Sequence, residues 1–235
     1  QSAITSVWGG FSLRWYTALF NTEQIIEAAL LSLKIAATSA TFATILGTMA
    51  GLALTQMGRY RGRLIFTGLI AAPLVMPEVI TGLSLLLMFV SLQELIGWPL
   101  SRGAGTITIA HITFSMAYVA VIVQSRLSSM DQSLQEAAMD LGGRPTQVAF
   151  DITLPLIAPS MLSGWLLAFT LSLDDLVIAS FTSGAGASTL PMVIFSKIKL
   201  GVTPDINALA TLIIGTVSIG IMIASWVMFR QSKRN

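Results

Sequence analysis

Five long stretches of apolar residues alternate with short polar segments along the chain. Each is long enough for an α-helix to cross a bilayer core, which takes about 20 residues. They cover residues 28–54, 64–92, 105–125, 156–181 and 206–229. None alternates with the period of two that a β-barrel strand requires, and a helix satisfies its own backbone in lipid. The pattern therefore predicts an all-α polytopic transmembrane bundle.

Charged residues are scarce throughout the chain. Of its 235 residues, 54% are hydrophobic and 10% are charged, and the mean hydropathy is +0.79. A soluble domain usually carries about 25% charged residues, so this composition excludes a soluble enzyme, a disordered chain and a nucleic-acid-binding protein. The sequence contains no Cys and one His, which excludes disulfides and metal sites built from thiolates or several imidazoles. We expect membrane lipid around the chain and no metal within it.

Lys and Arg residues in the loops predict the orientation in the membrane. Eight lie on one side: Arg59, Arg61, Arg63, Arg126, Arg144, Arg230, Lys233 and Arg234. Four lie on the other side: Arg14, Arg102, Lys197 and Lys199. Because cytoplasmic loops are enriched in positive charge, we expect the first side, including the C-terminal tail 230–235, to be cytoplasmic.

This orientation places residues 1–27 on the periplasmic side. No signal-type apolar segment precedes the first span, so we expect a further transmembrane helix upstream of this sequence. The transmembrane region is expected to cover 28–229. The Trp and Tyr side chains of residues 11–20 predict an interfacial helix there, since aromatic rings favour the headgroup level.

Glycine and proline mark particular points within the spans. Gly47 and Gly51 form a G-x-x-x-G pair, which indicates either close helix packing or chance in a span rich in small residues. Pro73 and Pro77 interrupt the second span, and such breaks are tolerated where neighbours or a cavity satisfy the backbone. The second span is therefore a candidate pathway helix.

The loop 126–155 is the most polar part of the chain and predicts two short helices. Asp131 can cap a helix over residues 132–141, and the two glycines that follow would end it. Pro145 suits the first turn of a second helix over residues 145–151. We expect this compact element to project into the cytoplasm.

The same loop carries a spaced motif. It consists of Glu136, Ala137 and Ala138, then Gly142 after three residues, then Ile152–Pro155 after nine more. This pattern resembles the EAA motif of ABC importer permeases. The resemblance implies a coupling helix that docks in a groove of a cytoplasmic ATPase subunit, with the coupling residues Glu136, Ala137, Ala138, Asp140 and Gly142. An ordinary amphipathic loop helix is the alternative.

The resemblance extends across most of the chain. Residues 72–87, 164–181 and 189–213 are similar to the polyamine branch of these permeases, and most of all to putrescine permease subunits of Gram-negative bacteria. It implies a six-helix subunit of the bacterial inner membrane that imports putrescine or spermidine. Its implied partners are a second homologous permease subunit, an ATPase dimer and a periplasmic polyamine-binding protein.

The nucleotide chemistry is expected to belong to another chain. This sequence has no G-x-x-x-x-G-K-[ST] phosphate loop. We therefore expect ATP and Mg to bind the partner ATPase, and this chain to have no cofactor and no enzymatic activity of its own.

Ionisable residues within spans are costly and mark candidate functional sites. This chain has five: Lys34, Glu78, His111, Asp174 and Asp175. At a rise of about 1.5 Å per residue, they fall near one level in the outer half of the membrane. With His neutral their charges sum to −2, which favours a cationic cargo. We expect Asp174, Asp175 and Glu78 to line the substrate pathway.

These residues also have structural alternatives. Asp174 and Asp175 point about 100° apart on a helix, so one is expected to face the pathway and the other a neighbouring helix or the partner permease. Glu78 would otherwise cap a broken helix or pair with Lys34. We expect His111 to be a packing residue with satisfied hydrogen bonds, and Lys34 to be a structural ion-pair partner.

Other functions stay open at this point. The segment 182–204 predicts a loop and a short helix at the outer mouth, either contacting a binding protein or serving as a solvated connector. A permease for another small cationic solute would share these features. A stand-alone secondary transporter would use the buried acids as ion sites, and a purely structural scaffold would need no acids. The expected function is a polyamine ABC importer permease that forms half of a translocation pathway.

Overall fold

The computed structural model describes residues 14–20, 22–58, 60–131 and 133–200, with a few single positions beyond them. Every regular element among these residues is a helix, which confirms the all-α prediction. The chain divides into two compact units, one of Gln1–Ala29 with Met192–Asn235 and one of Leu30–Pro191. The fifth expected span and the expected cytoplasmic tail lie largely outside the described residues.

The first unit contributes two short described helices. Helix α1, Arg14–Phe20, falls within the stretch expected to form an interfacial helix. Helix α10, Leu190–Leu200, begins at the end of the second unit and follows a loop, as the sequence predicts for this segment. In α10 the Lys199 ammonium lies 4.6 Å from the ring centroid of Phe195.

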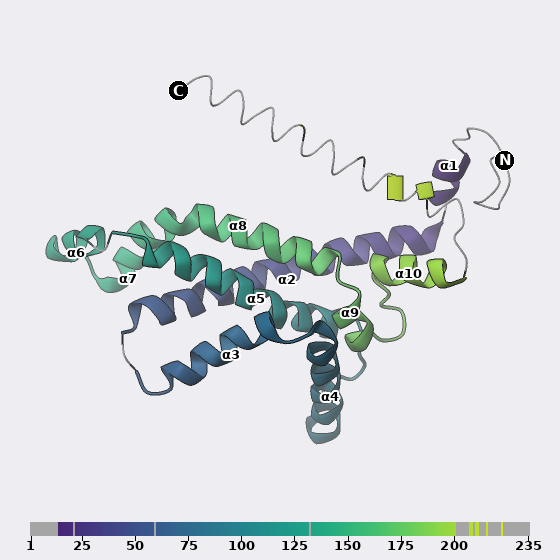
Figure 1. Ribbon diagram of the computed structural model, residues 1–235, viewed down its shortest axis with the longest axis horizontal. Helices are drawn as coiled ribbons and strands as arrows, with labels where there is room; N and C mark the ends of the chain where they lie inside the picture. Colours follow the sequence, from purple (N-terminus) through teal and green to yellow (C-terminus); the bar gives the residue numbers. More distant parts are fainter. Residues whose placement is uncertain are drawn as a thin grey trace. The chain divides into compact units, whose positions relative to one another are not determined.

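The second unit holds the helices that position the candidate site (Figure 1). In chain order the elements are α2 (Glu23–Gln56, which starts in the first unit), α3 (Arg63–Val75), α4 (Glu78–Ile96), α5 (Ala104–Ser128), α6 (Ser133–Asp140), α7 (Pro145–Val148), the π-helix η1 (Ala149–Thr153), α8 (Leu154–Leu173) and α9 (Val177–Thr182). Among the described residues, four helical stretches are long and apolar enough to cross a membrane: Glu23–Gln56, Glu78–Ile96, Ala104–Ser128 and Pro145–Leu173. They correspond to the first four predicted spans.

The second predicted span is broken into two helices. Helix α3 ends at Val75 and α4 begins at Glu78, with Pro77 immediately before it. In Figure 1 the axis of α4 runs steeply across that of α3. The 13 residues of α3 are too few to cross a core of about 30 Å, whereas α4 is long enough by itself. The predicted break is therefore confirmed at Pro77, whereas Pro73 lies inside α3 and does not interrupt it.

The boundaries predicted for the fourth span were wrong. We expected a separate helix over 145–151 and a span over 156–181, but the structure has one helical stretch over Pro145–Leu173. The π-helical turn η1 joins its parts, with the N–H of Leu154 bonded to the carbonyl of Ala149. Helix geometry therefore continues into Pro155 without a break.

Glycines allow three helices of the second unit to pack closely. A Cβ atom at Gly47 would lie 2.7 Å from Cβ of Val119, and one at Gly51 would lie 2.9 Å from Cγ1 of Val123. From the other side, a Cβ at Gly164 would lie 3.2 Å from Cγ1 of Val119. Val119 is fully buried between the two helices that carry these glycines. The close-packing interpretation of the G-x-x-x-G pair is confirmed.

This contact can be tested by filling it. We expect Gly47→Val to lower the apparent melting temperature of the purified chain in detergent, because overpacking a close contact costs about 1–3 kcal/mol. Gly68→Val is the matched control, since no atom of another helix lies within 4 Å of a Cβ there. Equal melting temperatures for the two variants would contradict the assignment.

Candidate functional site

Asp131 fixes the start of α6. Its Oδ1 accepts a hydrogen bond from the backbone N–H of Ser133 at 2.9 Å. That bond lowers the pKa of Asp131 below its usual value, because it favours the ionised carboxylate. The predicted cap is therefore present, and the helix covers Ser133–Asp140.

Two glycines end α6 in a tight turn, as predicted. Gly142 has a φ of 88°, and its N–H donates to the carbonyl of Met139 at 2.9 Å. The N–H of Gly143 donates to the carbonyl of Ala138 at 3.0 Å, which completes a Schellman motif. A Cβ at Gly143 would lie 2.7 Å from the Ala138 oxygen. The turn therefore has no room for a side chain at Gly143.

A side-chain hydrogen bond attaches α6 to the long helical stretch. Nε2 of Gln135 donates to Oγ1 of Thr153 at 3.1 Å, and Thr153 is only 1% exposed. Beyond the turn, the N–H of Arg144 donates to Oε1 of Gln147 at 3.0 Å. Both contacts tie the loop to the stretch that starts at Pro145 and ends at Leu173.

This element exposes several large apolar side chains, one of them beside a polar hollow. Helix α6 buries none of its residues. The large exposed apolar side chains at this end are Leu134, Met139, Leu141 and Phe150. Glu136 and Asp140 are also exposed. We call these six residues the loop surface; an apolar patch of this kind with charged neighbours is typical of a protein contact site.

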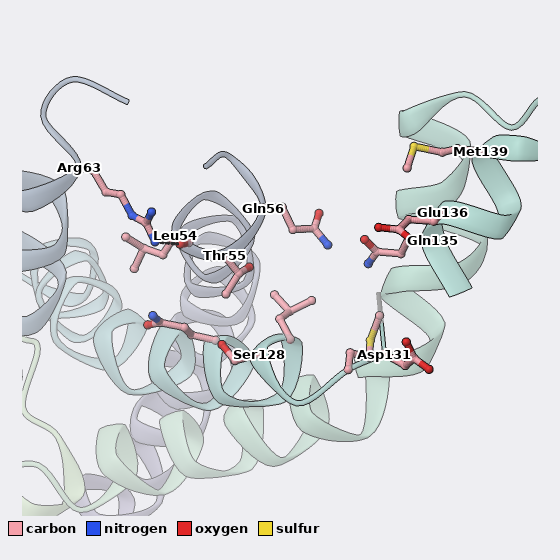
Figure 2. A pocket seen from close by; sticks show the side chains of 12 residues that line it. Leu54, Thr55, Gln56, Arg63, Ser128, Asp131, Gln135, Glu136 and Met139 are labelled. Carbon is pink, nitrogen blue, oxygen red and sulfur yellow. Dashed lines mark hydrogen bonds between the residues drawn. The ribbon is translucent and has the colours of Figure 1, made fainter. Parts of the chain in front are cut away.

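A polar hollow lies between α6 and the ends of α2 and α5 (Figure 2). Its volume is about 530 Å³. In Figure 2, Gln135 and Glu136 point from α6 toward Gln56 at the end of α2. On the far side, Nη1 and Nη2 of Arg63 donate to the carbonyls of Gly58 and Leu54, at 2.9 and 2.8 Å.

The residues that line the hollow show that the loop after α2 and the loop after α5 lie at the same end of the unit, as the charge pattern predicts. The charge pattern predicted a role in orientation only for Arg63, whereas its guanidinium also binds the carbonyls of Leu54, in the last turn of α2, and of Gly58 beyond it.

At the opposite end of these helices lies a buried polar cluster around His111. The imidazole is 2% exposed. Its Nδ1 lies 2.6 Å from Oγ of Ser172, and its Nε2 lies 3.2 Å from Oδ2 of Asp175. Oγ of Ser39 donates to Oγ of Ser172 at 3.0 Å. His111 is thus a packing residue with satisfied hydrogen bonds, as predicted.

The two neighbouring acids have different surroundings. The side chain of Asp175 is 8% exposed, and its carboxylate also accepts the backbone N–H groups of Ile178 and Ala179 at 3.3 and 2.7 Å. It therefore caps the start of α9. Asp174, which follows the last residue of α8, is exposed. We predicted that one acid of this pair faces the pathway and that the other faces a neighbouring helix or the partner permease. Asp175 is the acid that faces a neighbouring helix.

Glu78 and Lys34 do not pair. Glu78 is exposed in the first turn of α4, where a carboxylate complements the positive end of the helix dipole. Within the part of the chain that the structure describes, Lys34 forms no ion pair with it or with any other acid. The ion pair predicted for Lys34 is therefore not found among the described residues, where its side chain lies on a mostly apolar groove between α2 and α5 with Thr38 and Thr108 nearby.

The structure thus groups the predicted residues at two ends of one unit. The residues predicted to couple to an ATPase, Glu136, Ala137, Ala138, Asp140 and Gly142, all lie on α6 and its terminal turn. The acids of the predicted pathway lie at the ends of α4 and α8, with Asp175 against His111. Among the described residues no cluster of three or more His, Asp or Glu side chains is placed to hold a metal ion.

Sequence reasoning missed the serines of the buried cluster. Ser172 lies three residues before Asp175, a spacing that puts two side chains on one face of a continuous helix, and this signal is present in the sequence. Ser39 and His111 come from two other helices, so no spacing along the chain relates them to Asp175. Their meeting depends on tertiary packing alone.

Sequence comparisons place the chain among transport proteins. The family described as binding-protein-dependent transport system inner membrane component matches residues 25–235. The chain is 58% identical, over 100% of its length and 83% of the relative's, to the putrescine transport system permease protein PotI of Escherichia coli (strain K12). It is 41% identical to the spermidine/putrescine transport system permease protein PotC of Haemophilus influenzae, over 96% of this chain and 84% of the relative.

Solved structures share the fold. A bacterial ABC transporter involved in the import of the acidic polysaccharide alginate matches with a TM-score of 0.75 and 18% identity, covering 95% of this chain and 85% of that chain. The MetNI methionine ABC transporter in an inward-facing conformation matches with a TM-score of 0.69 and 15% identity, covering 92% and 97%. At these identities the likeness concerns the fold alone.

Proposed function

Because the chain belongs to the family of binding-protein-dependent transport system inner membrane components, we propose that it is a permease subunit of an ATP-driven importer of putrescine or spermidine. Membership makes it a transporter subunit rather than an enzyme. The observation that carries the polyamine assignment is the 58% identity over the whole chain to a putrescine permease. The acids at the ends of α4 and α8 support a cationic cargo.

The cargo would contact the exposed carboxylates. Asp174 is exposed where α8 ends, and Glu78 is exposed where α4 begins. Each carboxylate offers acceptors for an ammonium group that has lost water, through charge-assisted hydrogen bonds. Asp175 adds negative charge nearby while its oxygens are held by His111 and the start of α9. A diamine has an ammonium group at each end and so matches two separated acids.

The loop surface would receive the motion of an ATPase subunit. Its exposed apolar side chains and Glu136 offer a docking face, and ATP with Mg would bind the ATPase dimer. Displacement of α6 would pass through the Gln135–Thr153 bond to the helical stretch that ends beside Asp174. The ATPase would thereby bias the permease between two states that expose the acids to opposite sides.

The proposed assembly fixes the orientation of the chain. The hollow end and the tail 230–235 would face the cytoplasm, and residues 1–27 the periplasm, with the permease region over 28–229 in the bacterial inner membrane. A second homologous permease subunit would complete the pathway. A periplasmic polyamine-binding protein would deliver the cargo at the end that carries Asp174.

The cargo assignment predicts a specific uptake pattern. We expect proteoliposomes holding the full complex and its binding protein to accumulate labelled putrescine or spermidine with ATP inside, and not with a non-hydrolysable analogue. Uptake of another small cation in place of both polyamines would assign a different cargo. Uptake by this chain without the ATPase would identify a secondary transporter instead.

The pathway assignment predicts a loss of affinity on removal of one charge. We expect Asp174→Asn to raise the KM for putrescine about tenfold, because a hydrogen bond to a charged group contributes about 1.5–3 kcal/mol. The matched control is Asp151→Asn, which makes the same change at an exposed site in η1. Equal KM values for these two variants would contradict a cargo contact at Asp174.

The coupling assignment predicts an effect of the turn after α6. We expect Gly143→Ala to reduce ATP-driven uptake about tenfold without reducing the basal ATPase rate, because the added Cβ displaces the turn at a cost of about 1–3 kcal/mol. Gly68→Ala serves as the control, since the space around that position is open. Wild-type uptake by the Gly143→Ala complex would exclude this turn from coupling.

A further inference from the structure

The buried cluster joins four helices through one line of hydrogen bonds. It runs from Ser39 on α2 to Ser172 on α8, then to His111 on α5, and from there to Asp175. Asp175 ends the line on the first turn of α9. Each bond in it crosses between helices or bridges the gap between α8 and α9.

All polar atoms of the line are satisfied with a neutral imidazole. With its proton on Nε2, His111 donates to the carboxylate of Asp175 and accepts at Nδ1 from the hydroxyl of Ser172. The Ser172 oxygen then accepts from Ser39. The Asp175 carboxylate receives three N–H donors, from His111, Ile178 and Ala179. A fully satisfied network of this kind specifies one arrangement of the helices around it.

That arrangement determines how α8 ends. The helix stops at Leu173 and α9 starts at Val177, so only three residues connect them. Within this connection Asp175 is held on both sides, by α5 through His111 and by α9 through its own capping bonds. Asp174 is its immediate neighbour and has an exposed side chain. The direction in which Asp174 points therefore follows from the anchoring of Asp175.

We propose that His111 and Asp175 are positioning residues, which hold the carboxylate of Asp174 in the orientation that receives the ammonium group of the cargo. The positioning itself rests on the described contacts, while the role of Asp174 toward a polyamine rests on the proposed function. In this assignment His111 contacts no cargo and acts through the His111–Asp175 hydrogen bond.

Two substitutions of His111 separate this role from packing. The amide nitrogen of Gln reaches the place of Nε2, so His111→Gln keeps a donor for Asp175. The amide of Asn reaches only the place of Nδ1, so His111→Asn keeps the contact with Ser172 and loses the donor to Asp175. Both variants put one amide into the same buried site, which makes them a matched pair. Ser172→Ala is a further control that leaves the bond to Asp175 intact.

The orientation of position 174 can be measured without any cargo. The chain contains no cysteine, so Asp174→Cys provides a single site for a nitroxide spin label in a complex whose other subunits are cysteine-free. We expect the electron paramagnetic resonance spectrum to narrow in the His111→Asn background, because the α8–α9 connection gains freedom. The spectrum is expected to stay as in wild type with His111→Gln or Ser172→Ala. Equal spectra of the label at position 174 in the His111→Asn and His111→Gln backgrounds would overturn the proposal.

Transport kinetics then test the effect on cargo. We expect His111→Asn to raise the KM for putrescine about tenfold at an unchanged maximal rate, and His111→Gln to stay within about twofold. Adding His111→Asn to Asp174→Asn is expected to give no further increase, since both act through one carboxylate. Additive increases in KM, or a lower maximal rate with an unchanged KM, would overturn the proposal.

The two assignments fail in distinguishable ways. If the wild-type complex transports no polyamine, the proposed function fails, and the spin-label spectra still decide whether His111 positions residue 174. If Asp174→Asn impairs uptake while His111→Asn matches wild type in both measurements, the pathway role of Asp174 stands and the positioning role is wrong.

Discussion

The contact of Val119 with two glycines is the constraint on which the second unit depends. Gly47 on α2 and Gly164 on α8 leave space on either side of α5, and Val119 fills both spaces. In lipid no hydrophobic force drives helices together, so association relies on close van der Waals contact and hydrogen bonds between helices. Small residues at this level therefore set the distances between α2, α5 and α8 for the remainder of their lengths.

The buried polar cluster depends on the same three distances. Ser39, His111 and Ser172 each lie eight residues from this contact, on α2, α5 and α8 in turn, or about 12 Å along the helix axes. Hydrogen bonds tolerate only a few tenths of an ångström, so the serines and the imidazole meet only because the helices are already fixed two turns away. Steric packing thus places the polar groups, and the polar groups define the end of α8.

The parts of the structure that the sequence predicts are those governed by local chemistry. Span lengths follow from the bilayer, the start of α6 follows from the Asp131 cap, and its end follows from Gly142. The end of the fourth span was misjudged because apolar residues continue past Asp174 to residue 181. What stops the helix is the anchoring of Asp175 by a histidine from another helix, and hydropathy along one chain carries no information about that partner.

The continuous helical stretch over Pro145–Leu173 joins the locally determined turn at α6 to the buried cluster that tertiary packing assembles. Its first turn carries the hydrogen-bonded attachment of α6, and its last residue precedes the acids. Packed interiors do not deform continuously, so a displacement at Thr153 moves the stretch as a body against Val119. Such a movement would shift the α8–α9 connection relative to α5, and hence change the distance from Asp175 to His111. In the proposed assembly, one helical stretch would then receive the displacement of α6 at one end and orient the Asp174 carboxylate at the other, without a separate pathway of contacts between the two.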